Sequence, residues 1–419
     1  MKKLLLIVVI ILSIMAVAIA CTPTDNQTTP TTPTAVTSVV PQDDDNPWAH
    51  LRGTTVTFYG WGGGAAINAW IDGILAPTFY EEYGINLVRV PMDISDILNK
   101  LMGERMAGVQ SGDIDVVWIN GENFYFAQNA GLLYGPITHL IPNYTVYLNP
   151  DDPDLHYDFG TPINGMSVPY GRAQLVFVGD TAVLDSFPTS AQELLELARR
   201  YPGMITYPAP PQFTGSAFVR NIIYEIVGFE AINNAPVDED AIYEIIRPAL
   251  DFLIELKPYL WQQGRTYPAY PVQLRQMFID GMALFTISYT PLYAAQGIQA
   301  GEFPDTVQTF VFANGNIGNT HYVAVPFNAP NRDGAMALIN HIISAEMQIS
   351  KYDASNWGDM PVFDVERLSP EQRALLESID NGVGILPAEV LLNHRLPEVS
   401  AAKIPIIDRL WIEHVLHHR

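Results

Sequence analysis

The chain has 419 residues, and its 45 acidic side chains against 22 basic ones give a formal net charge of −23. Such an excess of acid argues against nucleic acid as a partner, because nucleic-acid binding needs a basic surface. At this length, 48% hydrophobic residues predict two folded domains. The single cysteine excludes a framework of disulfide bonds within the chain.

The first residues are typical of an export signal. Lys2 and Lys3 precede an uncharged run, residues 4–20, that ends in small side chains before Cys21. This ending resembles the bacterial lipoprotein box, which implies cleavage after Ala20 and a lipid on Cys21. The alternative, an uncleaved membrane anchor, needs about 20 apolar residues and leaves the position of the cysteine unexplained. We therefore expect a signal peptide over residues 1–20 and an exported chain, lipid-anchored to the outer face of the cell membrane.

Residues 21–50 have the composition of a tether. They are rich in Thr and Pro, include three consecutive aspartates at 43–45, and contain almost no large apolar side chain. Because such a segment cannot bury enough surface to offset the entropy of ordering, we expect it to be solvated and disordered.

Strands and helices alternate in the next part of the chain. Short apolar runs and helical spacing predict strands over 54–59, 85–90 and 114–119, and helices over 65–75, from Asp93 as N-cap to Gly108, and over 124–130. This alternation predicts a mainly parallel, doubly wound sheet, whose ligands bind beyond the carboxyl ends of the strands. Two of those ends are Gly-rich or polar, namely residues 60–64 and 120–123.

The following part predicts a second unit of the same class. Expected strands cover 173–178, 204–207, 283–288 and 306–312, and expected helices run from a capping box at Ser190 through Arg200, over 217–227 and over 333–344. Thr214 and Ser216 could cap the helix at 217, hold a polar ligand, or do both. Segments 168–172 and 318–326 suit a chain that crosses between two units and returns.

Several motifs together resemble a known family. They are Trp118-Ile119-Asn120-Gly121-Glu122-Asn123-Phe124, Tyr207-Pro208-Ala209-Pro210-Pro211 with Phe213-Thr214-Gly215-Ser216, Pro258-Tyr259-Leu260-Trp261 with Gly264-Arg265-Thr266-Tyr267-Pro268, and Ile317-Gly318-Asn319-Thr320-His321. The sequence is similar to the extracellular solute-binding lipoproteins of ATP-binding-cassette (ABC) transporters, within a poorly characterised branch that carries the Asn-Gly-Glu-Asn-Phe motif. The resemblance covers about residues 56–368, and residues 370–419 carry no motif that we can assign.

This resemblance implies a type II periplasmic-binding-protein-like fold of class α/β, in which two lobes close on a ligand. Each lobe is expected to be a mainly parallel sheet flanked by helices. The first lobe would comprise residues 51–168 plus about 323–352, and the second 169–322 plus about 353–419. It also implies an ABC permease and its ATPase as transport partners, with no cofactor.

A clamshell holds its solute with polar and aromatic groups from both lobes and from the crossings. The expected ligand-binding residues are Trp61, Gly62, Gly63, Asn120, Glu122, Asn123, Tyr170, Arg172, Tyr207, Thr214, Gly215, Ser216, Tyr289, Asn319 and His321. Glu122 and Trp61 suit a cationic group, whereas Arg172 and the helix starts after Gly64 and at Ser216 suit an anionic one. We therefore expect a small charged or zwitterionic solute and a monomeric binding protein.

The alternatives to solute binding explain less of the sequence. A surface-anchored hydrolase would need a catalytic constellation, but Phe218 replaces the second glycine of a Gly-x-Ser-x-Gly motif around Ser216. His414, His417 and His418 have the spacing of metal ligands on a helix, although a frayed terminus explains them better. A binding lipoprotein without a transport role is also open. We expect no enzyme activity and no metal site.

Overall fold

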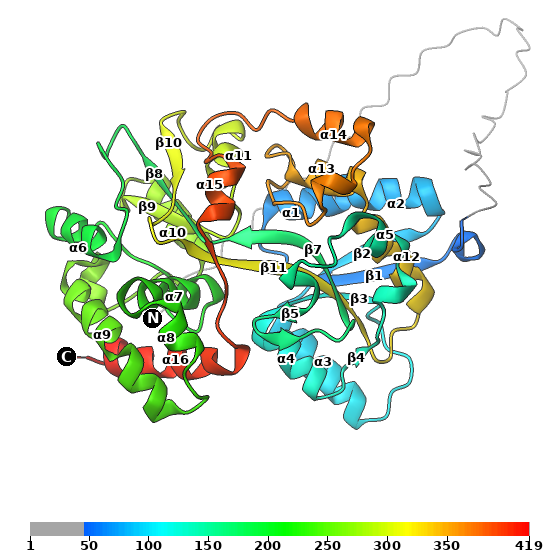
Figure 1. The fold of residues 1–419 in the computed structure, drawn as a ribbon, viewed down its shortest axis with the longest axis horizontal. Helices are drawn as coiled ribbons and strands as arrows, with labels where there is room; N and C mark the ends of the chain where they lie inside the picture. Colours follow the sequence, from blue (N-terminus) through cyan, green and yellow to red (C-terminus); the bar gives the residue numbers. More distant parts are fainter. Residues whose placement is uncertain (1–45, 419) are drawn as a thin grey trace, which may run out of the picture. The chain divides into compact units, whose positions relative to one another are not determined.

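The computed structural model describes residues 46–418 (Figure 1). The expected signal peptide, the lipidation site Cys21 and all but the last residues of the tether lie outside this range. Within it, none of the helices combines the length and the apolar character that crossing a membrane requires.

The larger sheet contains, within residues 46–418, seven strands in the order β12-β11-β3-β1-β2, with β4 and β7 also paired to β11. Its strands are β1 (Thr55–Gly60), β2 (Asn86–Pro91), β3 (Val116–Ile119), β4 (Leu133–Tyr134), β7 (Ser167–Gln174), β11 (Asn316–Pro326) and β12 (Arg395–Leu396). β1 pairs in parallel with β2 and β3, as the alternation of strands and helices predicts. β11 joins β3 in the antiparallel direction, so this sheet is mixed.

Helices cover both faces of this sheet, and we call the sheet with its helices the first lobe. They are α1 (Ala65–Trp70), a π-helical turn (Ile71–Leu75), α2 (Ala76–Tyr83), α3 (Ile94–Met106), α4 (Gly121–Asn129), α5 (Pro142–Tyr147), α12 (Arg332–Ile342), α13 (Ala345–Tyr352) and α14 (Pro370–Glu377). Val116 packs with α1, α2 and α12, and Val117 with α3 and α4, because successive strand residues face opposite sides. Asp93 occupies the N-cap position of α3 but makes no side-chain capping hydrogen bond.

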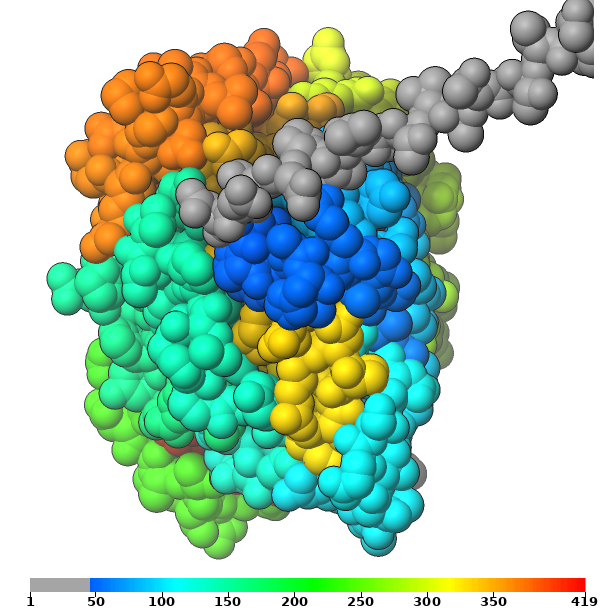
Figure 2. Space-filling view, turned by 90° about the vertical axis from the view of Figure 1, so that its right-hand side faces the viewer, coloured from blue at the N-terminus to red at the C-terminus, as the bar shows by residue number. Residues whose placement is uncertain are grey.

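Distant segments of the chain meet on the outer side of the first lobe. Figure 2 shows the residues at the start of β1, in blue, beside those that follow β11, in yellow. The Asn331 side-chain amide donates to the carbonyl of Thr55 at 2.9 Å, and the Asn331 backbone N–H donates to the Asp115 carboxylate at 2.7 Å. These bonds attach the segment after β11 to β1 and to the residue just before β3, which come earlier in the chain.

The two predicted crossings are neighbouring strands. β7 and β11 pair antiparallel from Gly318 opposite Gln174 to Ala324 opposite Ser167, with a bulge between His321 and Tyr322. In Figure 1 they run side by side through the middle of the fold, between the seven-stranded sheet and the three-stranded sheet. The segments 168–172 and 318–326, which the sequence suggests as crossings, therefore lie in two paired strands.

The three-stranded sheet, with its helices, is what we call the second lobe. The relative direction of its strands differs from the prediction. β8 (Val176–Asp180) lies between β10 (Val307–Phe310) and β9 (Phe285–Ser288), and both pairs are antiparallel. The expectation of a mainly parallel sheet is wrong for this lobe. A parallel pair of strands needs a long crossover connection, but a long connection does not itself force the parallel direction. Several helices lie between β8 and β9 in the chain, so their lengths and turns leave the direction of β9 free.

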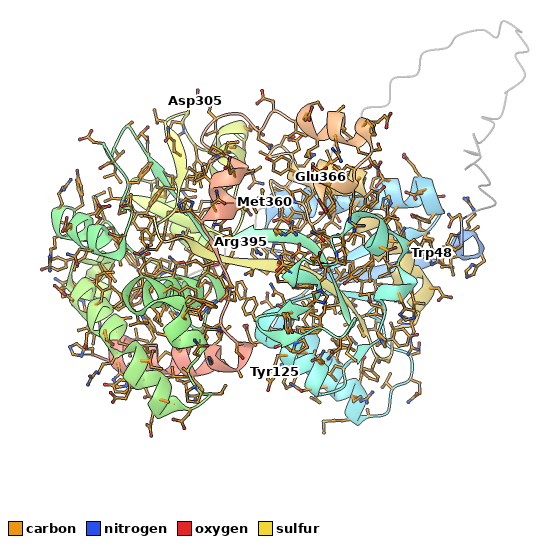
Figure 3. The ribbon with its side chains drawn as sticks, viewed as in Figure 1. Trp48, Tyr125, Asp305, Met360, Glu366 and Arg395 are labelled. Atoms are coloured by element: carbon orange, nitrogen blue, oxygen red, sulfur yellow. The ribbon has the colours of Figure 1, made fainter. Side chains whose placement is uncertain are left out.

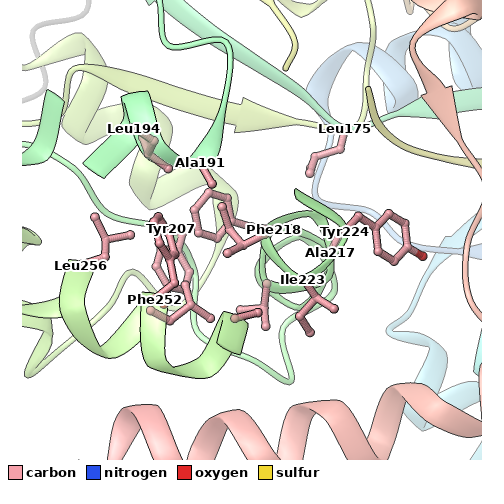
Figure 4. Packing of buried hydrophobic residues seen from close by; sticks show 14 of the residues in the cluster. Leu175, Ala191, Leu194, Tyr207, Ala217, Phe218, Ile223, Tyr224, Phe252 and Leu256 are labelled. Atoms are coloured by element: carbon pink, nitrogen blue, oxygen red, sulfur yellow. The ribbon is translucent and has the colours of Figure 1, made fainter. Parts of the chain in front are cut away.

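The second lobe is rich in helices. They are α6 (Ala191–Arg200), α7 (Phe213–Val227), α8 (Phe229–Asn233), α9 (Glu239–Leu256), α10 (Pro271–Ile279), α11 (Tyr293–Gln299), α15 (Ala388–Asn393) and α16 (Ile404–Trp411). Their core includes the stacked rings of Tyr207 and Phe218, whose centroids lie 4.3 Å apart (Figure 4). Ser190 caps α6 through the N–H of Glu193, but the Glu193 carboxylate accepts from Thr189, so only half of the predicted capping box forms.

Two local predictions in this lobe are wrong. Residues 204–207 form no strand; single hydrogen bonds hold them, from Leu284 N–H to the Met204 carbonyl and from Trp261 N–H to the Ile205 carbonyl. α7 begins at Phe213 instead of 217, because the Gln212 side chain accepts from the N–H of Gly215 at 3.0 Å and acts as its cap. Thr214 and Ser216 therefore lie inside the first turn of the helix.

The last fifty residues return to both lobes. β12 pairs with β11, and α16 packs against α9 and α7 in the second lobe. α14 packs against α13, which belongs to the first lobe. The lobe boundaries stay a prediction, but this packing leads us to propose that residues from about 353 to 380 belong to the first lobe instead of the second.

The C-terminal helix ends in an ordered turn. The Lys257 ammonium group donates to the carbonyls of Val415, Leu416 and His418 at 2.8–2.9 Å. The ring of His414 stacks on Tyr243 at 4.6 Å. Lysine at a helix C-terminus satisfies the last carbonyls, so the fraying that the sequence suggests is not what the structure has up to residue 418.

Candidate functional site

The start of α4 positions the first candidate group, Glu122. Asn120 has the extended backbone of an N-cap, and its side-chain amide donates to the carbonyl of Thr320 on β11 at 3.2 Å. The N–H of Gly121 donates to the Asp158 carboxylate at 2.8 Å, and Gly121 has a φ of 61° that favours glycine. Together these contacts fix the Asn-Gly-Glu turn against β11 and direct Glu122 out of the first lobe.

Glu122 is mostly buried, and its Oε2 has no hydrogen-bond partner among residues 46–418. Burial raises the pKa of Glu122; its own backbone N–H and the Arg220 guanidinium lower it, and the Glu398 and Asp408 carboxylates raise it. These three charged residues belong to the second lobe. Glu122 therefore lies where the start of α4 meets the second lobe.

Arg220, on α7, is the centre of a buried polar network in the second lobe. It is only 2% exposed, and its Nε and Nη2 donate to the two Glu398 oxygens at 2.9 Å each. Its Nη1 donates to Ser216 Oγ at 2.5 Å, and Ser216 Oγ donates to Asp408 Oδ1 at 2.6 Å. The Tyr289 hydroxyl donates to Glu398 Oε1 at 3.3 Å. The predicted residues Ser216 and Tyr289 thus meet in one network.

The sequence reasoning missed three members of this network. Arg220 carries a usable signal, since it is a basic side chain four residues after Ser216 in a mostly apolar helix. Glu398 and Asp408 carry none, because they bond to residues 178 and 192 positions earlier in the chain. Ser216 contacts a carboxylate and a guanidinium here, an arrangement that does not resemble a serine nucleophile beside a histidine.

The charges at this place do not balance. Arg220 forms a bidentate pair with Glu398, which leaves the carboxyl groups of Glu122 and Asp408 without a cation of their own. Burial raises the pKa of Asp408, although the bond from Ser216 and the charge of Arg220 lower it. Buried carboxylates are costly unless a proton or a positive group accompanies them. The arrangement therefore suits a positively charged group.

A second polar face lies on β11. Asn319 is 4% exposed, and neither atom of its side-chain amide bonds to any described residue. His321 follows on the same face, and its Nε2 lies 3.7 Å from Asp359 Oδ1. Burial lowers the pKa of His321 to about 4, against the opposing effect of Asp359, so the imidazole is neutral at pH 7.

Aromatic rings surround the imidazole of His321. The ring centroids of Trp118, Tyr170 and Trp357 lie 4.9, 5.9 and 6.0 Å from it. Tyr170 is buried on β7, its hydroxyl is unpaired within the described part of the chain, and burial raises its pKa well above the usual value. Tyr170 and His321, predicted from separate motifs, are therefore neighbours across the two crossing strands.

Arg172 is already paired within the protein. Its guanidinium binds the carboxylates of Asp152 and Asp154, and it donates to the Pro361 carbonyl at 2.9 Å. Figure 3 labels Met360, whose backbone bonds to that of Arg172, and Arg395, both near the middle of the fold. The expected role of Arg172 in binding an anionic group is thus not supported by its contacts.

Other predicted residues lie apart from these groups. The ring of Trp61 is 49% exposed and covers the backbone of Gly63, where an added Cβ would lie 2.4 Å from it. The Gly62 carbonyl accepts from the Asn68 side chain at 2.8 Å. Asn123 is partly buried in the first turn of α4. The Gly-rich turn therefore stays a candidate through Trp61 and the backbone of Gly62 and Gly63.

Three residues of the second lobe serve its own packing. Tyr207 is fully buried, and its hydroxyl accepts from the Trp411 indole at 3.2 Å, so a solute cannot reach it in this conformation. Gly215 lies where an added Cβ would be 1.8 Å from the Pro208 carbonyl, which requires glycine for close packing. Thr214 is buried in the same turn. Across residues 46–418, no group of three His, Cys, Asp or Glu side chains is arranged to hold a metal ion.

Comparison with known proteins identifies the family of this chain. Residues 75–374 match the family model described as bacterial extracellular solute-binding protein. Protein YnjB of Escherichia coli (strain K12) is 34% identical over 329 residues, covering 78% of this chain and 84% of that protein.

Solved structures show the same fold. The structure described as the Atu4243-GABA receptor has a TM-score of 0.58 at 20% identity and covers 87% of this chain and 98% of its own. A periplasmic thiamin binding protein has a TM-score of 0.58 at 18% identity and covers 86% and 95%. Both are solute-binding proteins of two lobes, and the likeness confirms the fold class. The chain therefore belongs to the bacterial extracellular solute-binding proteins, the solute-binding components of ABC transporters.

Proposed function

We propose that this protein is anchored to the membrane by a lipid on Cys21 and captures a small charged or zwitterionic solute between its two lobes. It then delivers the solute to an ABC permease driven by its ATPase. It acts as a monomer and without enzyme activity. Family membership supports export and the solute-binding role, and the lipoprotein-like sequence before Cys21 supports the anchor.

The observation that carries the proposal is the position of Glu122. It lies in the first turn of α4 in the first lobe and interacts electrostatically with Arg220, Glu398 and Asp408 of the second lobe. A solute held there contacts both lobes at once, which is what a closing clamshell requires. Binding stabilises the closed form only by the difference between the solute's affinities for the closed and open forms.

The residues that we propose to contact the solute are a subset of the predicted ones with three additions. From the first lobe and the crossings come Asn120, Glu122, Asn123, Asn319 and His321, and from the second lobe Ser216, Arg220, Tyr289, Glu398 and Asp408. Trp61 stays a candidate because its exposed ring can cover a solute once the lobes close.

The proposal is tested by native mass spectrometry of the full chain, purified in mild detergent, followed by thermal shifts. The panel contains organic cations, zwitterionic amino acids, anionic metabolites and neutral sugars. A solute present at a hundredfold excess over its Kd stabilises the protein by about 2.7 kcal/mol, which raises the melting temperature. A rise with charged or zwitterionic compounds supports the proposal, and a rise with sugars alone, or with none, contradicts it.

Replacing Glu122 by Gln tests the site itself. We expect Glu122→Gln to weaken a cationic or zwitterionic solute by about 1.5–3 kcal/mol, the value of a hydrogen bond to a charged group. The control is Glu244→Gln, which removes the same charge from the exposed surface of α9. Equal affinities of the two variants in a calorimetric titration would remove Glu122 from the site.

A further inference from the structure

We propose that Asn319 and His321, on one face of β11, bind an uncharged group of the solute that both donates and accepts hydrogen bonds. A primary amide and an amino-substituted heteroaromatic ring have this chemistry. The inference rests on the proposed function and narrows it, because the solute is then an organic cation that carries a neutral donor–acceptor group.

The side chain of Asn319 supplies the first reason. An asparagine amide has two donor hydrogens and an acceptor oxygen, and buried amides of this kind are almost always bonded. Asn319 is 4% exposed, yet its Oδ1 and Nδ2 are both unbonded among the described residues. Its bonding capacity is therefore available to a molecule that is not part of the chain.

Asn316, on the same strand, provides the contrast. Its Oδ1 accepts from the Phe312 N–H at 3.0 Å, and its Nδ2 donates to the Leu175 carbonyl at 2.8 Å. Both asparagines are buried, and two residues of β11 lie between them. A buried asparagine in this strand is thus satisfied when its role is structural, which makes the free amide of Asn319 informative.

His321 supplies a second polar atom on the same side of the strand. Residues i and i+2 of a strand face the same way, and the Nδ1 of His321 is also free of partners within residues 46–418. Asp359, beside its Nε2, already has its charge matched by the Lys351 ammonium group at 2.9 Å. The Arg395 guanidinium, which donates to the Asn319 carbonyl at 3.0 Å, is paired with the Asp154 carboxylate at 3.5 Å. Each charged group near the imidazole thus has a partner within the protein, and three aromatic rings surround it.

These conditions select an uncharged group. A second charge beside the rings would lose its hydration without gaining a counter-charge. A neutral group with a donor and an acceptor instead satisfies the Asn319 amide and the His321 nitrogen together. The charged part of the solute finds its partner elsewhere, at Glu122.

The two places are physically connected. The Asn120 side chain, two residues before Glu122, donates to the Thr320 carbonyl, which lies between Asn319 and His321 in β11. One small molecule therefore spans from the carboxyl of Glu122 to the face of β11. This connection predicts that both ends contribute to affinity for the same solute.

The test compares matched compounds on the full chain by calorimetric titration. Aminopyrimidinylmethylamine is paired with benzylamine, and ω-amino amides of increasing length are paired with diamines of the same length. We expect the member with the neutral donor–acceptor group to bind at least about tenfold more tightly in one of these pairs, because sites built to hydrogen-bond a substrate reject analogues that lack the group. Equal affinities throughout, or no binding by any of these compounds, would overturn the inference.

Two substitutions of Asn319 identify the cause of such a preference. Asn319→Leu should abolish the preference, and its melting temperature without solute should equal or exceed that of the unchanged protein. Asn319→Asp should reverse the preference toward the diamines, because its carboxylate accepts bonds and carries a negative charge. The matched control, Asn316→Leu, should lower the melting temperature by removing two bonds that the structure contains.

Other results would separate the inference from the proposed function. A preference that survives both Asn319 variants, or a melting temperature of Asn319→Leu as low as that of Asn316→Leu, assigns Asn319 a structural role and overturns the inference. Tight binding of plain amines or of zwitterions without a neutral group also overturns it, but leaves the proposed function standing. Failure of every charged compound in the wider panel instead rejects the proposed function.

Discussion

The Arg220 network and the Asn319 face are both buried and polar, but only the first is complete. Arg220 donates to Glu398 twice and to Ser216 once, and Ser216 passes a bond to Asp408. On β11, the Asn319 amide and the Nδ1 of His321 lack partners among residues 46–418. A satisfied network stabilises its own lobe, whereas free polar atoms are a cost that binding of a solute removes. The difference separates polar groups that are already bonded before a solute binds from polar atoms whose bonding capacity is still unused.

Breaking the Arg220 network should have the largest effect. Arg220→Met leaves the Glu398 carboxylate buried without its cation, and we expect the free energy of unfolding to fall by about 3–5 kcal/mol. Urea denaturation of the solute-free protein measures this change. The double variant Arg220→Met with Glu398→Leu should recover most of it, because the Glu398 carboxylate is then no longer buried without its cation. A loss below about 1 kcal/mol in the single variant would mean that the pair is solvated and the comparison fails.

The neutral state of His321 should make stability depend on pH. Its pKa is lowered from 6.5 to about 4 in the folded protein. Between these values the unfolded chain binds the extra proton, so the free energy of unfolding decreases as pH falls from about 6.5 to 4. A shift of this size corresponds to about 3 kcal/mol. Below pH 4 His321 is protonated in both the folded and the unfolded state. Its contribution to the free energy of unfolding is then fully lost.

His321→Gln isolates this contribution. Denaturation of both proteins at pH 7 and pH 4 should show a smaller loss of stability in the variant, by about 3 kcal/mol. The comparison is needed because burial raises the pKa values of Glu122 and Asp158. Those two groups take up protons in the folded state and act in the opposite direction at low pH. The same loss in both proteins would show that His321 is exposed to water.

Two tyrosines on the paired crossing strands give the smallest and most closely matched contrast. Tyr322 bonds through its hydroxyl to the carbonyls of Asp154 at 2.9 Å and Tyr157 at 3.0 Å. Tyr322→Phe should therefore cost about 1 kcal/mol. Tyr170→Phe removes a hydroxyl that is unpaired in the described structure, and should change stability by less than about 0.5 kcal/mol. Thermal unfolding measures both, and equal losses would mean that the Tyr170 hydroxyl is bonded in solution.

Much of the fold follows from local patterns. The run before Asn120 is a buried strand and the residues after it form a helix, as predicted. The wrong predictions are those in which a neighbour distant in sequence decides the outcome. Residues 204–207 have the composition of a strand but find no strand to pair with. The start of α7 is a local exception, because Gln212 caps it although two better caps, Thr214 and Ser216, lie nearby.

The candidate site was predictable only in part. Glu122, Ser216, Tyr289, Asn319 and His321 follow from motifs in the sequence, and the structure places each of them in one of the two polar groups. Arg172 and Tyr207 follow from the same kind of reasoning, yet both are occupied inside the protein. A polar or aromatic side chain in a junction indicates a contact, but its partner is not visible in the sequence.

The sequence by itself determined the class of fold, most of its strands and helices, and the family to which the chain belongs. Periodicity, glycines and motifs act within a few residues of one another, and such short-range effects can be seen in a sequence. Only the tertiary structure decided the antiparallel second sheet, the addition of Glu398 and Asp408, and which polar atoms remain unbonded. The reason is that these outcomes depend on partners far away in the chain. An unbonded polar atom costs free energy only when it is buried, and its burial is decided by the folded structure.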